Sequence, residues 1–290
     1  MYLCLKDGPT MIFSNPLVMT LVLIQVTASH QGGPTRPHPP ANQSRLEGQG
    51  RRKRRDLRGR VEKKRSLRLD VNQWVPWTVG LSAGVLWLGL ELVKRREGPR
   101  RCRLCNGPAK GPPKLWGPDA AFRAALRVRH ATVADRISSI LAFGVLPAWS
   151  AGTLLLIRWD PWRRRLEDLS LLYEAVAISS LLQQITSLAV ARRRPEATFH
   201  QVAGNNGFEN TSFFSGHTTL AFTLAASAVS LLHMRGNRWT WLVALVGFSA
   251  ATAVGLLRVA ADKHFMSDVV VGAAVGTATG FLVPKLSLRW

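Results

Sequence analysis

The sequence has only three cysteines among 290 residues: Cys4, Cys102 and Cys105. The spacing of Cys102 and Cys105 fits either half of a zinc site or a local disulfide. No second pair is present to complete the four ligands of a structural zinc ion, so we predict no metal site. An odd number of cysteines says little about the compartment in which the chain folds.

Acidic residues are also scarce. The chain has 17 Asp and Glu against 39 Lys and Arg, which gives a formal net charge of +22. Such a charge would suit a nucleic-acid-binding protein. The densest basic run, RRKRR at 51–55, has no interleaved aromatic residues and lies in no recognisable nucleic-acid-binding module. We therefore predict no nucleic-acid partner.

The first 72 residues lack the composition of a folded core. Residues 1–29 contain an apolar run, MIFSNPLVMTLVLIQVTA, that ends in small residues and suits a signal peptide or an uncleaved anchor. Residues 30–72 are rich in Gly, Pro, Arg and Gln, which predicts a basic, largely disordered segment. Such a charge run is usually solvated or lies against anionic lipid head groups.

Strand-like alternation is absent, and six apolar segments follow instead. They cover residues 74–93, 137–157, 169–190, 217–233, 239–257 and 267–283. Crossing a hydrocarbon core about 30 Å thick takes about 20 residues of helix. We therefore predict an all-α fold, a six-helix transmembrane bundle over residues 73–290. Gly272, Gly276 and Gly280 recur every fourth residue, a spacing that lets another helix approach closely in lipid.

Polar residues collect at one end of this predicted bundle. If the chain crosses at each segment, side A holds the basic N-terminal segment and the loops 158–168 and 234–238. Side B then holds the loops 94–136, 191–216 and 258–266. Side A carries a slight excess of Lys and Arg, so the positive-inside rule puts side A in the cytoplasm. A cleaved signal peptide would invert this orientation.

Two polar clusters at side B combine a histidine with a group that can assist it. His264 and Asp268 are four residues apart, so on a helix they share one face. A carboxylate beside an imidazole fixes its tautomer and leaves Nε2 with a lone pair. Ser215, Gly216 and His217 open the fourth segment, where unpaired helix N–H groups attract an anion.

Two arginines accompany these clusters. Arg194 precedes a proline and Arg258 lies six residues before His264. A guanidinium fork suits a tetrahedral oxyanion. One histidine as nucleophile, another as acid and two arginines that hold a phosphate together predict phosphoryl transfer.

These residues resemble the three signature motifs of the type-2 phosphatidic acid phosphatase superfamily, in its bacterial membrane branch. The vanadium haloperoxidases belong to the same superfamily. The motifs, in order, are Arg194-Pro195, Ser215-Gly216-His217 and Arg258-x5-His264-x3-Asp268.

The resemblance implies a role for each residue. His264 would be the nucleophile that becomes phosphorylated, and Asp268 would orient it. His217 would protonate the leaving oxygen and then activate water. The phosphate cradle would consist of Arg194, Ser215, Gly216 and Arg258, and no metal or other cofactor is implied.

Three positions depart from the family pattern. Ser187 stands where a lysine is usual, Phe214 where a proline is usual and Leu257 where a serine is usual. The missing lysine removes one phosphate-binding cation, for which Arg192 and Arg193 are the candidate substitutes.

The resemblance therefore implies a metal-independent lipid phosphatase that acts through a phosphohistidine. Together with the positive-inside rule, it predicts a protein of the bacterial inner membrane with its site facing the periplasm. Candidate substrates are phosphatidic acid, phosphatidylglycerol phosphate and an isoprenyl diphosphate. Two alternatives remain open. One is a lipid phosphotransferase of the same fold, and the other is a non-catalytic lipid-binding membrane protein, which Ser187 favours.

Overall fold

The computed structural model describes residues 74–99, 101–105, 115–156, 161–199 and 208–288. These residues form helices, turns and one isolated bridge between Leu104 and Arg192, and none of them forms a strand. The predicted all-α fold is thus confirmed for this part of the chain. The predicted signal peptide or anchor (1–29) and the predicted basic segment (30–72) lie outside the described residues.

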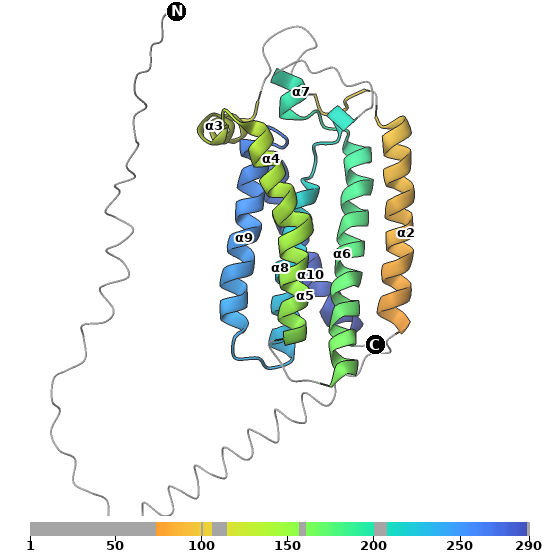
Figure 1. Ribbon diagram of the computed structural model, residues 1–290. Helices are drawn as coiled ribbons and strands as arrows, with labels where there is room; N and C mark the ends of the chain where they lie inside the picture. Colours follow the sequence, from red (N-terminus) through yellow and green to blue (C-terminus); the bar gives the residue numbers. More distant parts are fainter. Residues whose placement is uncertain (1–73, 100, 106–114, 157–160, 200–207, 289–290) are drawn as a thin grey trace, which may run out of the picture. The chain divides into compact units, whose positions relative to one another are not determined.

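Within the described residues, each of the six apolar segments lies in a long helix, except for Trp239, which precedes α9 (Figure 1). The long helices are α2 (Trp74–Glu97), the continuous α4 (Ala131–Ile140), η1 (Leu141–Val145) and α5 (Leu146–Leu156), α6 (Trp162–Val190), α8 (Gly216–Met234), α9 (Thr240–Ala260) and α10 (Met266–Ser287). Successive long helices run in opposite directions in Figure 1, so sides A and B are opposite ends of the bundle.

Three short helices lie toward side B. They are α3 (Gly117–Leu126), α7 (Pro195–Phe199) and the 3-10 turn η2 (Phe208–Asn210). Figure 1 looks along the axis of α3, so this helix lies across the direction of the long helices.

The predicted loop 94–136 is wrong, because much of it is helical. Helix α2 continues to Glu97, past its apolar part, and its last turn carries Lys94, Arg95 and Arg96. Positive side chains stabilise the C-terminal end of a helix, where the macrodipole is negative. The next long helix begins at Ala131. Lys94, Arg95 and Arg96 near side B therefore belong to a helix, and the helix fixes the directions of their side chains.

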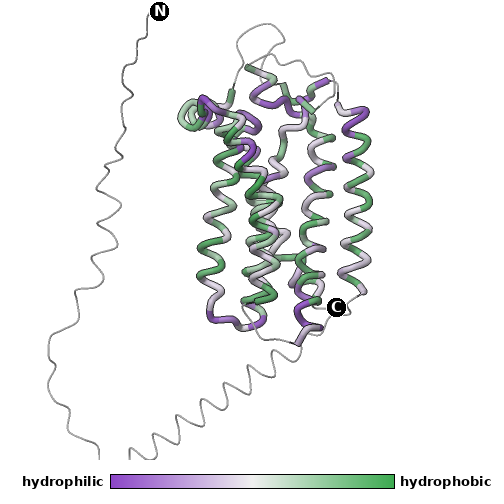
Figure 2. The backbone as a smooth tube through the Cα atoms, in the orientation of Figure 1, coloured by the Kyte–Doolittle hydropathy of each residue, from purple (hydrophilic) through white to green (hydrophobic). Residues whose placement is uncertain are grey.

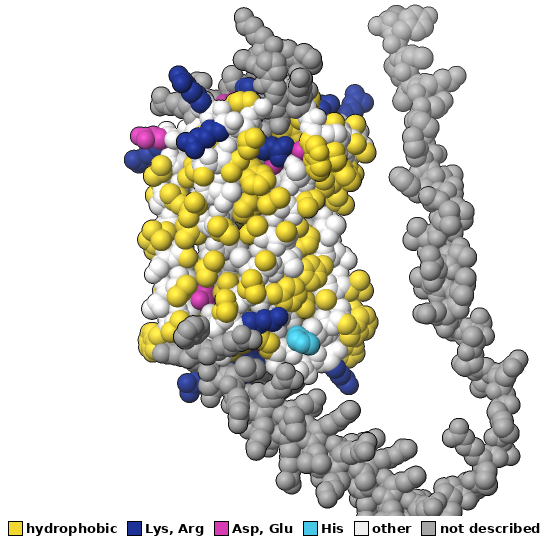
Figure 3. All heavy atoms as spheres, turned by 180° about the vertical axis from the view of Figure 1, so that it is seen from behind, with side chains coloured by type: hydrophobic (Ala, Val, Ile, Leu, Met, Phe, Trp, Pro, Cys, Tyr) yellow, Lys and Arg dark blue, Asp and Glu magenta, His cyan; other side chains and the backbone are white. Residues whose placement is uncertain are grey.

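Four helices are long and apolar enough to cross a membrane: α2, the stretch α4–α5, α9 and α10. Their middle parts are hydrophobic in Figure 2, and in Figure 3 hydrophobic side chains are spread over the middle of the molecule while most charged side chains lie near its two ends. On α2, for example, Val85 and Leu86 are 69% and 59% exposed. Apolar surface of this extent is stable in contact with lipid rather than water. The chain is an integral membrane protein.

Helices α6 and α8 are not among these four. Helix α6 buries the acidic side chains Glu167, Asp168 and Glu174. Helix α8 is rich in Ala, Ser and Thr and is buried along most of its length. A helix enclosed by other helices needs little apolar surface of its own. The count of six membrane crossings stays a prediction.

The glycines of α10 allow it to pack closely on α8. A Cβ added at Gly272 would lie 2.9 Å from the carbonyl oxygen of Ser215, and one added at Gly280 would lie 2.7 Å from that of Thr223. Gly276 makes a similar close approach. The predicted role of the glycine repeat is confirmed. The packing also holds the start of α10 beside the start of α8, since the Ser215 N–H donates to the Asp268 carbonyl at 3.1 Å.

Candidate active site

A cavity of about 430 Å³ lies at side B. Residues from α2, η1, α6, α8, α9 and the connecting segments line it. Five predicted site residues are among them: Arg194, Gly216, His217, Arg258 and His264. The structure therefore brings residues of both polar clusters and both arginines to one cavity, as their common side predicted. Ser215 and Asp268 are fully buried and do not line it.

The ring of His264 lies in the turn between α9 and α10 and is 3% exposed. Its Nδ1 is 2.7 Å from the carbonyl oxygen of Ser212. A carbonyl only accepts, so Nδ1 carries the proton and Nε2 keeps its lone pair. Burial, and then the positive charges of Arg194 and Arg258, hold the pKa of His264 well below its ordinary value. The imidazole is therefore neutral at neutral pH.

Asp268 does not contact His264 as the sequence predicted. Its Oδ2 is 3.9 Å from His264 Nδ1, which is too long for a hydrogen bond. The same oxygen instead accepts from the Ser212 hydroxyl at 2.6 Å and from the Phe265 N–H at 3.0 Å. An acidic side chain in the first turn of a helix commonly caps it in this way, by accepting a hydrogen bond from the backbone N–H of the N-cap residue. Asp268 thus holds Ser212, and the Ser212 carbonyl orients the imidazole.

Arg192 lies behind this pair rather than in the cavity. Its guanidinium donates to Asp268 Oδ1 at 2.5 Å and to Asp119 Oδ2, on α3, at 2.9 Å. With two carboxylates as partners, Arg192 is a positioning residue for Asp268. Neither Arg192 nor Arg193 lines the cavity, so neither replaces the family lysine that is absent at Ser187.

Two arginines present positive charge to the cavity. The Nε atoms of Arg194 and Arg258 are buried and have no hydrogen-bond partner among the described residues. Buried polar groups normally have a partner. One Nη of Arg258 pairs with Asp135 on α4. The remaining donors suit an oxyanion bound between the two guanidinium groups.

The segment that carries Arg194 is braced on both sides. Helix α6 ends at Val190, and the next residue, Ala191, adopts a left-handed conformation with φ of 47° that turns the chain out of the helix. On one side, the Arg193 N–H donates to the Leu104 carbonyl at 3.3 Å. On the other, the Arg194 N–H donates to the Glu209 carbonyl at 2.7 Å.

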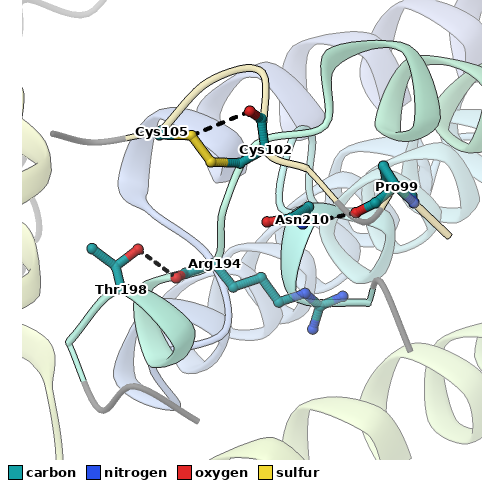
Figure 4. The surroundings of a disulfide bond; sticks show 6 residues. All are labelled: Pro99, Cys102, Cys105, Arg194, Thr198 and Asn210. Carbon is teal, nitrogen blue, oxygen red and sulfur yellow. Dashed lines mark hydrogen bonds between the residues drawn. A yellow bond between two sulfur atoms is a disulfide. The ribbon is translucent and has the colours of Figure 1, made fainter. Parts of the chain in front are cut away.

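A disulfide between Cys102 and Cys105 closes the loop on the first side (Figure 4). Of the two interpretations of the cysteine pair, the disulfide is therefore the one found. In Figure 4 the loop lies beside the segment from which Arg194 extends, and the Arg194 carbonyl accepts from the Thr198 hydroxyl at 2.8 Å. The disulfide loop thus helps to position the arginine segment.

His217 lies in the first turn of α8 and contacts the second long helix. Its Nε2 is 3.1 Å from Ser139 Oγ, and the Phe143 ring packs edge-on against the imidazole at 4.7 Å between centroids. Ser215, the residue before the helix, accepts from the Thr218 hydroxyl at 2.9 Å and makes no side-chain cap. At this helix start, Gly216 rather than the Ser215 hydroxyl faces the cavity.

Sequence reasoning missed the contributions of two helices. From α4 come Asp135 and Ser139, which contact Arg258 and His217, and from α2 comes Lys94, which lines the cavity. The available signal was weak. Each is a polar residue at the side-B end of an apolar segment. This position indicates the correct end of the bundle, but it does not show which residue the side chain contacts.

Comparison with protein families gives a match over residues 168–290, to the model of the PAP2 superfamily. This region belongs to the PAP2 superfamily. The resemblance noted in the sequence is confirmed. Among solved structures, the chain is similar to a transmembrane PAP2-type phosphatidylglycerolphosphate phosphatase from Bacillus subtilis. The identity is 19% and the TM-score 0.47, with 72% of this chain and 96% of that chain covered. A search of curated proteins found no match.

The PAP2 region contains every site residue predicted from the sequence, from Arg194 to Asp268. Lys94, Asp135 and Ser139 all precede it. The side-B cavity is therefore built from the PAP2 region together with helices that the family model does not cover.

Proposed function

We propose that the chain is a metal-independent phosphatase that hydrolyses a membrane lipid phosphate or diphosphate through a phosphohistidine intermediate. One observation carries the proposal. The neutral imidazole of His264 lies in the wall of the same cavity as Arg194 and Arg258, whose Nε donors have no partner among the described residues. The match of residues 168–290 to the PAP2 superfamily model supports the assignment to phosphoryl transfer.

In the first step, His264 Nε2 attacks phosphorus in line with the leaving oxygen. A P–N bond forms as the P–O bond of the substrate breaks, and His217 gives a proton to the departing alkoxide or phosphate. The Ser212 carbonyl stabilises the positive charge that develops on the ring, because it accepts the Nδ1 proton. Arg194, Arg258 and the Gly216 amide hold the three peripheral oxygens.

In the second step, His217 removes a proton from water, and the water oxygen attacks phosphorus as the P–N bond breaks. Inorganic phosphate leaves, and His264 returns to its neutral form. In both steps the positive charge comes from arginine side chains, which is why we infer that the reaction needs no metal ion. Asp135 and Ser139 act as positioning residues, for Arg258 and His217 respectively.

The site faces the periplasm of a bacterial inner membrane in our proposal. Side A carries the excess of basic residues, which favours a cytoplasmic side A. The Cys102–Cys105 disulfide belongs to side B, and disulfides persist mainly in oxidising compartments. Both observations support an outward side B.

Labelling of single cysteines tests the orientation. In a Cys4→Ser background, Trp116→Cys at side B should react with a membrane-impermeant maleimide on intact cells. Arg163→Cys at side A should react only after permeabilisation. Both positions are largely exposed. The reverse pattern would overturn the orientation and leave the chemistry untouched.

A turnover assay tests the chemistry. Purified protein in detergent micelles should release inorganic phosphate from at least one of phosphatidic acid, phosphatidylglycerol phosphate and an isoprenyl diphosphate. EDTA should leave the rate unchanged, and vanadate should inhibit by adopting the trigonal-bipyramidal shape of the transition state. Loss of activity in EDTA, with recovery on adding a divalent cation, would contradict the metal-independent mechanism.

The same assay separates the two alternatives. A phosphotransferase would form a new phosphate ester with an added alcohol acceptor and release little inorganic phosphate. A non-catalytic lipid-binding protein would bind vanadate and turn over none of the three lipids.

A further inference from the structure

We propose that Lys94 binds the substrate phosphate, as a cation that α2 supplies to the cavity from outside the PAP2 region. The inference deepens the proposed phosphatase function and rests on it. It makes α2 part of the binding site rather than only a membrane helix.

The position of Lys94 is unusual for a lysine. It is 9% exposed and lines the same cavity as Arg194 and His264. A buried ammonium group is unfavourable unless it is paired. Nζ lies 2.9 Å from Glu91 Oε2 and 3.2 Å from Gln184 Oε1 on α6. Nζ also lies 5.3 Å from the centroid of the Phe208 ring, which lines the same cavity. An ammonium has three N–H donors, so the two oxygen partners leave one donor for an anion in the cavity.

The packing of α2 on α6 fixes this position. Gly80 lets the ring of Tyr173 approach the α2 backbone, since an added Cβ would lie 2.8 Å from that ring. Trp77 packs on the same ring with 5.8 Å between centroids. The contact aligns α2 with α6 and brings the last turns of α2 to the height of the cavity.

Lys94 reaches the place that a lysine at position 187 would occupy. The Ser187 side chain is fully buried, and its hydroxyl donates to the Gln184 carbonyl at 3.0 Å. A longer helical side chain at 187 would lean back over the preceding turn, where Gln184 meets Lys94 Nζ. Helix α2 thus provides the positive charge that α6 does not carry.

Glu91 holds Lys94 in position. Its carboxylate accepts from Lys94 and from Gln184 Nε2, the latter at 2.9 Å, and its other oxygen lies 3.1 Å from Arg95 Nε. Since Arg95 and Gln184 remain as partners, loss of the Lys94 charge does not leave Glu91 unpaired. Lys94→Met should therefore have little effect on the stability of the fold, while it removes one positive charge from the cavity.

The test compares two neighbouring charges on α2. Vanadate binding to the full-length protein in detergent is measured by calorimetry for wild type, Lys94→Met and Arg96→Met. Arg96 is exposed and does not line the cavity. We expect Lys94→Met to raise the vanadate Kd about tenfold or more, as for loss of a hydrogen bond to a charged group, and Arg96→Met to leave it unchanged. A Kd within twofold of wild type for Lys94→Met would overturn the proposal.

Two further measurements keep the proposal testable. In wild-type protein, vanadate should protect Lys94 from acetylation by acetic anhydride, as read by mass spectrometry, and absence of protection would contradict the proposal even if the variant fails to fold. Ser187→Lys added to Lys94→Met should restore binding, and absence of rescue would contradict the shared position. If wild type binds vanadate through Lys94 but hydrolyses no lipid phosphate, the phosphatase proposal fails and the Lys94 assignment stands.

Discussion

The two ends of the bundle both bury charges, and they balance them differently. At side A, Arg235 is 2% exposed and lies 2.8 Å from Asp168 and 3.5 Å from Glu167. At side B, four cations line the cavity, Lys94, Arg95, Arg194 and Arg258, and the carboxylates paired with them are Glu91 and Asp135.

A buried cation whose charge is balanced by neighbouring carboxylates links the helices that carry them, because the two groups neutralise each other and share hydrogen bonds. An excess of positive charge around a cavity requires an anion from outside the chain. Side A is therefore interpreted as structural and side B as the site. Variants that separate activity from stability test this distinction.

The largest effect is expected at His264. Replacing His264 by Ala should lower kcat by a factor on the order of 10⁴ or more and abolish phosphate labelling of the protein, because the proposed nucleophile is lost. Rapid-quench experiments with a ³²P-labelled substrate measure both. His233→Ala, an exposed histidine at side A, is the control and should behave as wild type. Residual turnover above about one-hundredth of the wild-type rate would rule out His264 as the nucleophile.

A smaller loss is expected at His217. His217→Ala should lower kcat by about 10²- to 10⁴-fold, the usual contribution of a general acid and base. With a good leaving group such as 4-nitrophenolate, the first step no longer needs the acid, so labelled protein should accumulate. Equal loss with good and poor leaving groups, without accumulation, would mean that His217 has another role.

Asp268 should affect both rate and stability. Asp268→Asn should lower kcat by about 10- to 100-fold, the range known for groups that orient a functional histidine, because Ser212 is no longer fixed. It should also lower the free energy of unfolding by about 1–3 kcal/mol, since Arg192 loses a charged partner while keeping Asp119. Denaturation followed in parallel with kinetics measures the two. A loss of rate near that of His264→Ala would instead indicate that Asp268 touches the imidazole during the reaction.

Ser139 should have a modest effect on rate alone. Ser139→Ala should lower kcat about fivefold, as for one neutral hydrogen bond worth about 1 kcal/mol, and leave KM nearly unchanged. Ser139→Thr should restore the rate, because it retains the hydroxyl that meets His217 Nε2. A change in KM without a change in kcat would place Ser139 in substrate binding instead.

Arg235 at side A should show the opposite pattern. Arg235→Met should lower the free energy of unfolding by about 3–5 kcal/mol, because it removes a buried positive charge that lies beside Asp168 and Glu167. The kcat of the folded protein should stay within about twofold of wild type. A selective loss of kcat would show that the two ends are coupled and that side A is more than structural.

Much of the fold was predictable because it depends on local patterns. The apolar segments, the absence of strand alternation and the Gly272-to-Gly280 spacing each reflect the periodicity of a helix in lipid. The common side of Arg194, His217 and His264 followed from counting crossings. Where the helices end was less predictable, since α2 continues through charged residues to Glu97.

By itself, the sequence determined the all-α class, the motifs and the end of the bundle where they meet, because these depend on residue type and spacing along the chain. Only the tertiary structure decided which atoms touch. Asp268 reaches Ser212 rather than His264, and Lys94 arrives from a helix about 90 residues earlier in the chain than Gln184. Such contacts depend on how helices pack and rotate against one another, and no spacing within a single helix encodes them.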